Sequence, residues 1–318
     1  MTRVKLRHGL AVLALNLPAL AQACGACGCT LNADWASQGY NVGPGLRFDL
    51  REDYINQNQL WSGGGAVSRS AFPLPADQEI QQKTVTHTTT LGLDYSLNYQ
   101  WGVSLQLPYI DRYHTTVGEG DTEESASHTH GIGDVRVLGR YQGFTPTHRT
   151  GIQFGLKLPT GAFDETFSSG PAAGTPFDRG LQAGTGTTNA LLGGFHYGTL
   201  SERVGYFAQG LAEVPLNSRA GFKPGDVINA SAGLRWLDAK WLVPQIQLNA
   251  HWEDRESGAL ADVDNSGARQ LFVSPGVNLN INSHFGAYAF AQLPIYQHVR
   301  GLQLEPQSQF SVGVHYRL

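Results

Sequence analysis

The chain ends in FSVGVHYRL, residues 310–318, where side chains of opposite character alternate at almost every position. In an extended strand, successive side chains point to opposite faces. One face would therefore carry apolar side chains, and the other would carry small, polar or charged ones. The apolar set is Phe310, Val312, Val314, Tyr316 and Leu318. This pattern predicts a β-strand that separates a hydrophobic medium from a polar one.

The same alternation recurs upstream. We expect strands near residues 45–56, 84–98, 101–114, 131–142, 149–160, 188–198, 203–215, 227–237, 241–253, 270–281, 285–297 and 307–318. The links between them alternate in length. The long ones are 57–83, 115–130, 161–187, 216–226, 254–269 and 298–306. Short turns on one side and longer loops on the other are typical of bacterial outer-membrane barrels. The predicted fold is therefore all-β: a transmembrane antiparallel up-and-down β-barrel of about twelve strands.

A secreted β-sandwich or solenoid is the alternative fold, because either would also alternate. Two features favour the barrel. Aromatic side chains gather near strand ends, as in Tyr99 with Trp101 and Trp236 with Trp241, which is typical of interfacial girdles. Arg and Asp side chains occur at mid-strand, where a water-filled lumen would hold them. In lipid every backbone polar group must be paired internally, which a closed barrel achieves.

The first residues have the features of a signal peptide. A basic start with Arg3, Lys5 and Arg7 precedes an apolar stretch, and Ala21-Gln22-Ala23 is a small-x-small cleavage site. Cleavage there would leave Cys24 first. Lipidation of Cys24 is the alternative, but a lipoprotein box needs a large aliphatic residue where Ala21 stands.

This gives three predicted segments: a cleaved signal peptide at 1–23, a periplasmic cysteine-containing segment at 24–44 and an outer-membrane barrel at 45–318. We expect both termini in the periplasm. Removing three cations and no anions takes the formal charge from -4 to about -7, so no nucleic-acid partner is expected.

The polar faces of the predicted strands supply candidate pore-lining residues. They can be interpreted as a paired charge network that fills a small barrel, or as a selectivity lining for small solutes. Barrels of this size lie between packed interiors and open porin channels. The candidates are Arg47, Asp49, Arg51, Asp94, Asp134, Arg136, Arg140, Lys157, Glu213, Arg235, His251, Glu253 and Arg317.

Two groups of residues are candidate metal ligands, although no cofactor is required. Cys24, Cys27 and Cys29 could converge on a soft metal such as Cu(I) or Zn(II), or form a disulfide that leaves one thiol for a partner. The predicted loop 115–130 and its edge hold the other group, His114, His128 and His130, beside several carboxylates. An acidic surface loop without a specific metal is the alternative there.

An enzyme is not expected. An outer-membrane phospholipase would need a Ser–His–Asn arrangement at the outer leaflet, whereas Ser283 and His284 fall in a predicted periplasmic turn. A barrel protease would need paired Asp together with Asp-His, and Asp111 with His114 offers half of that set.

Several stretches resemble a family of Gram-negative outer-membrane proteins named for transport in the meta-pathway of phenol degradation. They are Gly131-Ile132-Gly133-Asp134-Val135, Leu156-Lys157-Leu158-Pro159-Thr160-Gly161, Gly184-Thr185-Gly186, Pro224-Gly225, Ser274-Pro275-Gly276 and the final strand. They occur in family order over about 100–318. The resemblance implies an outer-membrane barrel that passes small hydrophobic or aromatic compounds.

The predicted function is therefore a porin-like channel for passive passage of small solutes, in contact with outer-membrane lipid and lipopolysaccharide. The alternative is a non-conducting barrel that docks a periplasmic redox or metal-handling protein through Cys24, Cys27 and Cys29. Conductance separates these two hypotheses.

Overall fold

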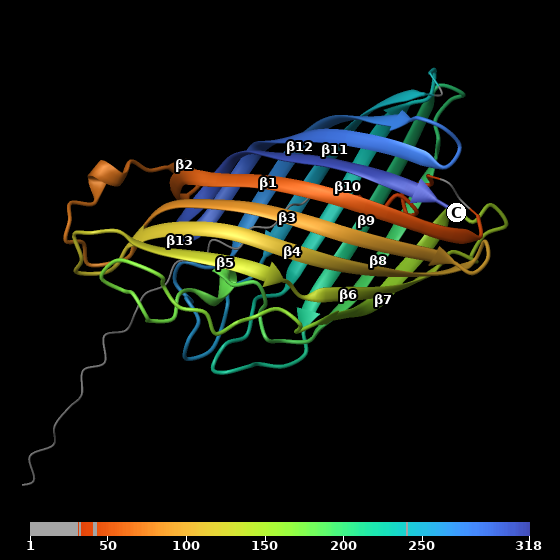
Figure 1. The fold of residues 1–318 in the computed structure, drawn as a ribbon. Helices are drawn as coiled ribbons and strands as arrows, with labels where there is room; N and C mark the ends of the chain where they lie inside the picture. The colour runs from red at the N-terminus through yellow and green to blue at the C-terminus, as the bar shows by residue number, and fades with distance from the viewer. Residues whose placement is uncertain (1–30, 32, 41–42, 240) are drawn as a thin grey trace, which may run out of the picture.

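The computed structural model describes residues 31, 33–40, 43–239 and 241–318. These residues form one antiparallel sheet that closes on itself, as Figure 1 shows. Neighbouring strands follow chain order, and β13 pairs with β1 to complete the barrel. No helix in the described part of the chain is long and apolar enough to cross a membrane.

The sheet has thirteen strand segments. They are β1 Gly45–Gly63, β2 Gly65–Ala66, β3 Ile80–Ser96, β4 Trp101–Val117, β5 Ser125–Ile132, β6 Val135–Tyr141, β7 Thr150–Leu158, β8 Asn189–Thr199, β9 Val204–Pro215, β10 Val227–Trp236, β11 Leu242–Glu253, β12 Ala268–Asn280 and β13 Phe285–Arg317. Two short 3₁₀ helices, η1 Arg69–Ala71 and η2 Arg179–Leu181, lie in connections.

The number of barrel crossings is close to the predicted twelve. The two-residue β2 is a small appendage of β1. Segments β5 and β6 both pair with β4 and together make one crossing. The 33-residue β13 makes two crossings, because its first half pairs with β12 and its second half with β1. Together these features leave twelve crossings.

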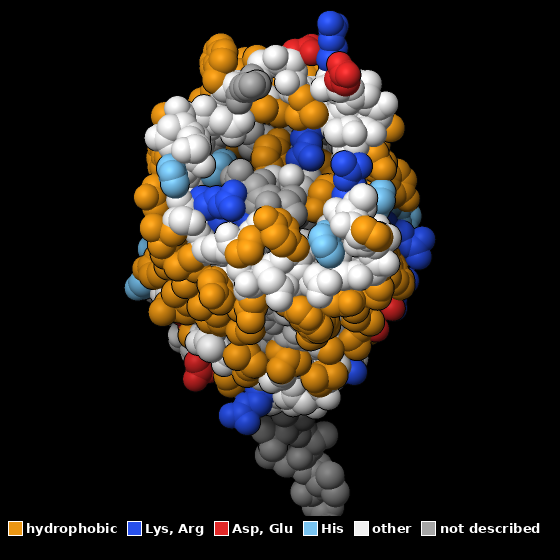
Figure 2. Space-filling model, turned by 90° about the vertical axis from the view of Figure 1, so that its right-hand side faces the viewer, with side chains coloured by type: hydrophobic (Ala, Val, Ile, Leu, Met, Phe, Trp, Pro, Cys, Tyr) orange, Lys and Arg blue, Asp and Glu red, His pale blue; other side chains and the backbone are white. Residues whose placement is uncertain are grey.

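The alternating pattern sets which side chains face outward. Phe310, Val312, Val314 and Tyr316 are exposed on the outer surface, whereas Ser311 between them is fully buried. Figure 2 looks onto one end of the barrel and shows hydrophobic side chains over its flank, with Lys and Arg side chains toward its middle. An apolar outer surface around a polar interior is what a bilayer-spanning barrel requires.

The two ends of the barrel differ. At one end, here called the turn end, short connections join the strands at residues 97–100, 142–149, 200–203, 237–241 and 281–284. At the other, the loop end, connections run over 67–79, 118–124, 159–188, 216–226 and 254–267, and all of these except 118–124 are longer than any at the turn end. The chain's C-terminus lies at the turn end, on the right of Figure 1. The aromatic side chains of Tyr99, Trp101, Phe144, Trp236 and Trp241 are exposed near the turn end, as expected of a girdle.

Several predicted loops are wrong at the loop end, because strands continue beyond the point where alternation is lost. Strand β1 runs on to Gly63, with irregular pairing on both sides of Gln57 that moves the register without ending the strand. The predicted long link 298–306 is instead the tight bend inside β13. There Gly301 has φ +65, and an added Cβ would collide with Asn265 and the Asp264 carbonyl oxygen.

Candidate functional site

The lumen contains a central cavity of about 320 Å³. Strands β1, β3, β4 and β6–β11 line it from the wall, and residues of the 159–188, 216–226 and 254–267 connections line it from the loop end. Its charged side chains balance in sign, with five Arg or Lys facing five Asp or Glu. These are Arg51, Arg112, Arg136, Lys157 and Arg179 against Asp53, Asp134, Glu213, Glu253 and Glu256.

Glu213 on β9 is the centre of one charge network in this cavity. Its carboxylate accepts from Arg136 at 2.8 Å and from Lys157 at 2.5 Å. The Asn189 amide donates to it at 2.6 Å. Glu213 and Lys157 are buried, whereas Arg136 retains about a third of its side-chain exposure. Arg136 is therefore the member of this network that is most exposed to the open space of the cavity.

Asp134 has a different role, because both of its oxygens are used to hold the 159–188 connection. Oδ1 accepts from the Gly161 amide at 3.1 Å, and Oδ2 accepts from the Thr185 amide and hydroxyl at 3.0 Å each. Hydrogen bonds of a carboxylate to backbone amides are among the stronger polar contacts in proteins. Asp134 thus anchors both ends of this long connection.

The 159–188 connection, predicted as an outer loop, folds around its own hydrophobic cluster. Phe167, Phe177 and Leu181 are buried together. Arg179 lies over the rings of Phe163 and Phe222, at 4.5 and 5.1 Å from their centroids. The connection therefore forms part of the cavity wall.

At the turn end, residues 33–40, which precede β1 in the chain, lie inside the lumen. The described residues Asp34–Gly39 make a turn in which Trp35, Ser37 and Gln38 are buried. The Trp35 indole donates to Asp49 of β1 at 3.1 Å and packs against Tyr288 of β13. We call residues 33–40 the plug. A cavity of only about 80 Å³ remains beside it.

Polar side chains of the wall bind the plug from several strands. Ser37 donates to Gln209 at 2.7 Å, and Gln245 donates to the Gln38 side chain at 3.0 Å. The Arg235 guanidinium lies 4.6 Å from the centroid of the Tyr40 ring. Contacts with β1, β9, β10, β11 and β13 thus hold the plug across the width of the lumen.

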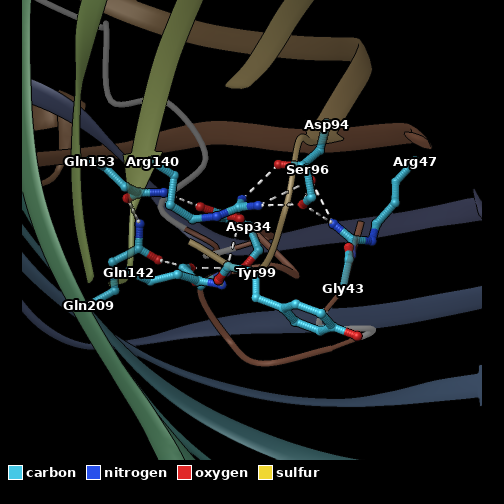
Figure 3. Close-up of polar contacts among 11 residues, drawn as sticks. Asp34, Gly43, Arg47, Asp94, Ser96, Tyr99, Arg140, Gln142, Gln153 and Gln209 are labelled. Carbon is cyan, nitrogen blue, oxygen red and sulfur yellow. Dashed lines mark hydrogen bonds and ion pairs between the residues drawn. The ribbon is translucent and has the colours of Figure 1, made fainter. Parts of the chain in front are cut away.

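A second charge network lies beside the plug (Figure 3). The Asp94 carboxylate receives Arg47 at 2.6 Å on one oxygen and Arg140 at 2.7 Å on the other. Ser96 accepts from both guanidinium groups, at 3.1 and 2.8 Å. Gln153 of β7, the cross-strand neighbour of Arg140, donates to Asp34 of the plug. This network joins β1, β3 and β6 at the turn end.

The structure places the predicted pore-lining residues on the inner side of the wall, in three settings. Around the central cavity lie Arg51, Asp134, Arg136, Lys157, Glu213, His251 and Glu253. Around the small cavity beside the plug lie Arg47, Asp49, Asp94 and Arg317. Arg140 and Arg235 contact Asp94 and the plug residue Tyr40.

The predicted histidine metal site is not assembled. His128 and His130 do share one face of β5, with ring centroids 5.3 Å apart, but they point outward, and His128 pairs with Asp111 at 2.8 Å. His114 lies on β4 with its ring buried on the inner side, bonded to Thr84 at 2.8 Å. The predicted loop is largely strand, and in a strand alternate side chains face opposite sides of the sheet. The ring of His114 therefore lies on the inner face, and those of His128 and His130 lie on the outer face. Within the described ranges, no three His, Cys, Asp or Glu side chains are arranged to hold a metal.

The interpretation of Cys24, Cys27 and Cys29, and that of the signal peptide, lies outside the described residues.

The sequence interpretation missed the plug and the neutral side of the lumen. Trp35, Ser37, Gln38 and Tyr40 precede the first alternating strand, so periodicity could not place them. On β11–β13 the inner face is packed with buried amides and hydroxyls, among them Gln247, Asn249, Gln270, Ser274, Asn278, Gln292 and Gln309. Their regular spacing between lipid-facing residues was the available signal.

Comparison with known proteins bears on the fold. No protein-family model matches the sequence, and no curated protein matches it. An outer membrane channel from Pseudomonas putida F1 has a similar structure, with 13% identity and a TM-score of 0.62, covering 86% of this chain and 96% of that one. The translocator domain of the autotransporter NalP from Neisseria meningitidis covers 87% of this chain and 90% of its own, with 12% identity and a TM-score of 0.48. The first of these shows the fold, a closed β-barrel like that of the Pseudomonas putida F1 channel.

Proposed function

We propose that the protein is a passive channel of the bacterial outer membrane for small solutes. The observation that carries this proposal is a closed barrel with an apolar outer surface that encloses a charged cavity of about 320 Å³. A packed interior would leave no such space, and an apolar outer surface suits lipid. The similar barrel from Pseudomonas putida F1 is itself named an outer membrane channel, which supports the proposal by analogy.

In this proposal the turn end faces the periplasm and the loop end faces outward, with lipopolysaccharide around the loops. Short periplasmic turns are the rule among bacterial barrels. An epitope inserted at residues 119–124 should then be reached by antibody on intact cells. The same epitope inserted at 200–203 should be reached only after the outer membrane is permeabilised. The reverse result would invert the orientation.

The solute class is the finer part of the proposal. Opposite charges balance around the cavity, so neither small anions nor small cations are favoured strongly. The resemblance to the phenol-pathway family adds small aromatic compounds to the candidates. Liposome swelling with sugars, amino acids and aromatic acids of matched size would rank these classes.

Planar-bilayer recording tests the channel itself. Purified protein should give discrete single-channel steps. A protein that is correctly folded by its heat-modifiable gel shift, yet gives neither steps nor swelling even after removal of the plug, would favour the non-conducting docking barrel instead. That rival has no support from the described residues, because its cysteines lie outside them.

A further inference from the structure

A second, smaller cavity of about 70 Å³ lies under the loops, apart from the lumen. Residues from the end of β4, the start of β5 and the 159–188 connection surround it. Its wall carries four carboxylates, those of Glu79, Glu119, Asp121 and Asp178, and none of the residues lining it is Lys or Arg. The remaining wall is largely apolar and includes Phe167, Ala172 and Leu181.

Three buried polar atoms in this wall lack a hydrogen-bond partner among the described residues: His114 Nε2, Thr116 Oγ1 and Asp178 Oδ2. Their residues are 1%, 2% and 5% exposed. Nearly all buried polar atoms in native proteins are hydrogen-bonded, and leaving one unsatisfied is costly. Three such atoms around one cavity indicate a polar occupant.

The other contacts of these residues define what each open atom offers. Asp178 Oδ1 accepts from the Gly180 amide at 2.9 Å, which leaves Oδ2 as an acceptor. His114 Nδ1 bonds to Thr84 at 2.8 Å. When Nδ1 carries the proton, His114 Nε2 is an acceptor too. The Thr116 hydroxyl accepts as well, so the site can receive several N–H donors at once.

The charge of the surroundings selects a cation. Burial and the neighbouring carboxylates of Glu256 and Asp262 raise the pKa of Asp178 well above its usual range. A bound cation would replace the proton that this favours and leave Asp178 Oδ2 as an acceptor. Water could satisfy the open atoms, but it would bring no positive charge to the four carboxylates of this wall. A directly bound metal ion does not fit, because no three potential ligands in the described part of the chain are arranged to hold one.

We propose that this cavity binds a small primary ammonium ion, with its N–H groups on Asp178, Thr116 and His114 and its alkyl part against Phe167 and Leu181. A cavity of this size has room for a few heavy atoms, since one water needs roughly 10–15 Å³ of such space. The site is separate from the proposed solute path and does not depend on it.

Its wall is nevertheless shared with the lumen. Asp178 and Leu181 face this cavity, whereas Arg179 and Gly180 line the central one. The short helix η2 thus separates the two spaces.

Calorimetric titration of the full-length purified protein tests the proposal, with n-butylammonium, tetramethylammonium and calcium chlorides as the three probes. We expect saturable binding of n-butylammonium alone, because tetramethylammonium has no N–H donor. Asp178→Asn and Thr116→Val should each weaken that binding at least about tenfold. Glu123→Gln is the matched control. It removes an exposed carboxylate of the connection 118–124 that does not line the cavity, so binding should stay unchanged.

Thr116→Val also separates binding from folding. Without ligand it removes a buried hydroxyl that has no partner among the described residues, so the thermal midpoint should stay level or rise. The increase in that midpoint caused by n-butylammonium should disappear. Absence of n-butylammonium binding, wild-type affinity in both variants, or tight calcium binding that the same variants abolish would each overturn the ammonium site.

Discussion

The two ends of this lumen are built on the same alternating strands, yet they hold different contents. At the turn end the plug occupies the interior and leaves a cavity of about 80 Å³. Toward the loop end the connection 159–188 lines the wall, and a cavity of about 320 Å³ stays open. The strand pattern therefore determines a tube, and segments outside that pattern determine how much of it is open. In the proposed channel, we therefore expect the plug to limit the passage of solute.

Deleting residues 33–40 should have the largest effect, because it removes the contents of the turn end. We expect a severalfold increase in single-channel conductance in planar bilayers. The control is Phe144→Ala with Trp241→Ala, which removes two exposed aromatic side chains at the same end but outside the lumen. Equal conductance in the deletion and the wild type would show that the plug does not limit flow.

Arg140→Ala tests how much the buried charge network beside the plug contributes to stability. The Asp94 carboxylate then keeps its contact with Arg47 but loses the Arg140 guanidinium, whose side chain is only 6% exposed. Breaking such a buried pair should cost about 3 kcal/mol of unfolding free energy. We would measure this by urea unfolding followed through tryptophan fluorescence.

The matched control for that measurement is Arg203→Ala. Its partner Asp238 is 3.4 Å away, and the two side chains are 80% and 60% exposed. Removing this pair should cost less than about 1 kcal/mol. Similar losses in the two variants would contradict the contrast between buried and exposed pairs.

The loop end should respond to pH through Asp262. Burial raises its pKa from 3.8 to about 6, so the folded protein holds this proton at a pH where the unfolded chain releases it. Its stabilising contribution is therefore complete below about pH 4 and is lost as the pH rises through about 6, by up to about 3 kcal/mol. Asp262→Asn should flatten the dependence of unfolding free energy on pH over this interval, whereas the exposed Asp226→Asn should not. A slope that Asp262→Asn leaves unchanged would assign the effect to other groups.

Glu213→Gln should change the ion selectivity of the 320 Å³ cavity, with a smaller effect than the plug deletion has on conductance. It removes the carboxylate that faces Arg136 and Lys157, while its amide oxygen can still accept from Asn189. The cavity becomes more positive, so the reversal potential in a KCl gradient should move toward the chloride value. Glu52→Gln, on the outer face beside His87 and Thr89, is the control that should not move it. A shift in the control alone would place the selective charges elsewhere.

The smallest measurable change concerns the chain just before the plug. If two of Cys24, Cys27 and Cys29 form a disulfide, the intact mass of the protein isolated without reductant should be about 2 Da below that of the reduced chain. Bound metal would add its own mass in native spray, and an acyl chain would add several hundred daltons. Three thiols that alkylate fully without reductant would contradict both the disulfide and the metal hypothesis.

Most of the strand wall could be predicted from sequence because lipid and water impose a two-residue period on it. That period located the inner charges, such as Arg136 and Glu213, on the correct face. The two-residue period could not predict the segments whose structure is not periodic. The plug around Trp35 is a compact turn held by side chains from five strands, and η2 depends on loop packing around Phe177. His114, His128 and His130 do not converge as predicted, because β4 and β5 extend further than the alternation of apolar residues indicates.

The seam between β1 and β13 has a consequence for assembly. It joins residues that are far apart in sequence, as in the pair Arg47 and Arg317, so it must form after the intervening chain is in place. Closing a loop of this length carries an entropic cost, and such non-local pairing is slow compared with hairpin formation. The plug precedes β1 in the chain, and Trp35 contacts both sides of the seam, through Asp49 of β1 and the His315 ring of β13. We therefore expect the plug to act as an internal template that brings β1 and β13 together before their backbone hydrogen bonds form.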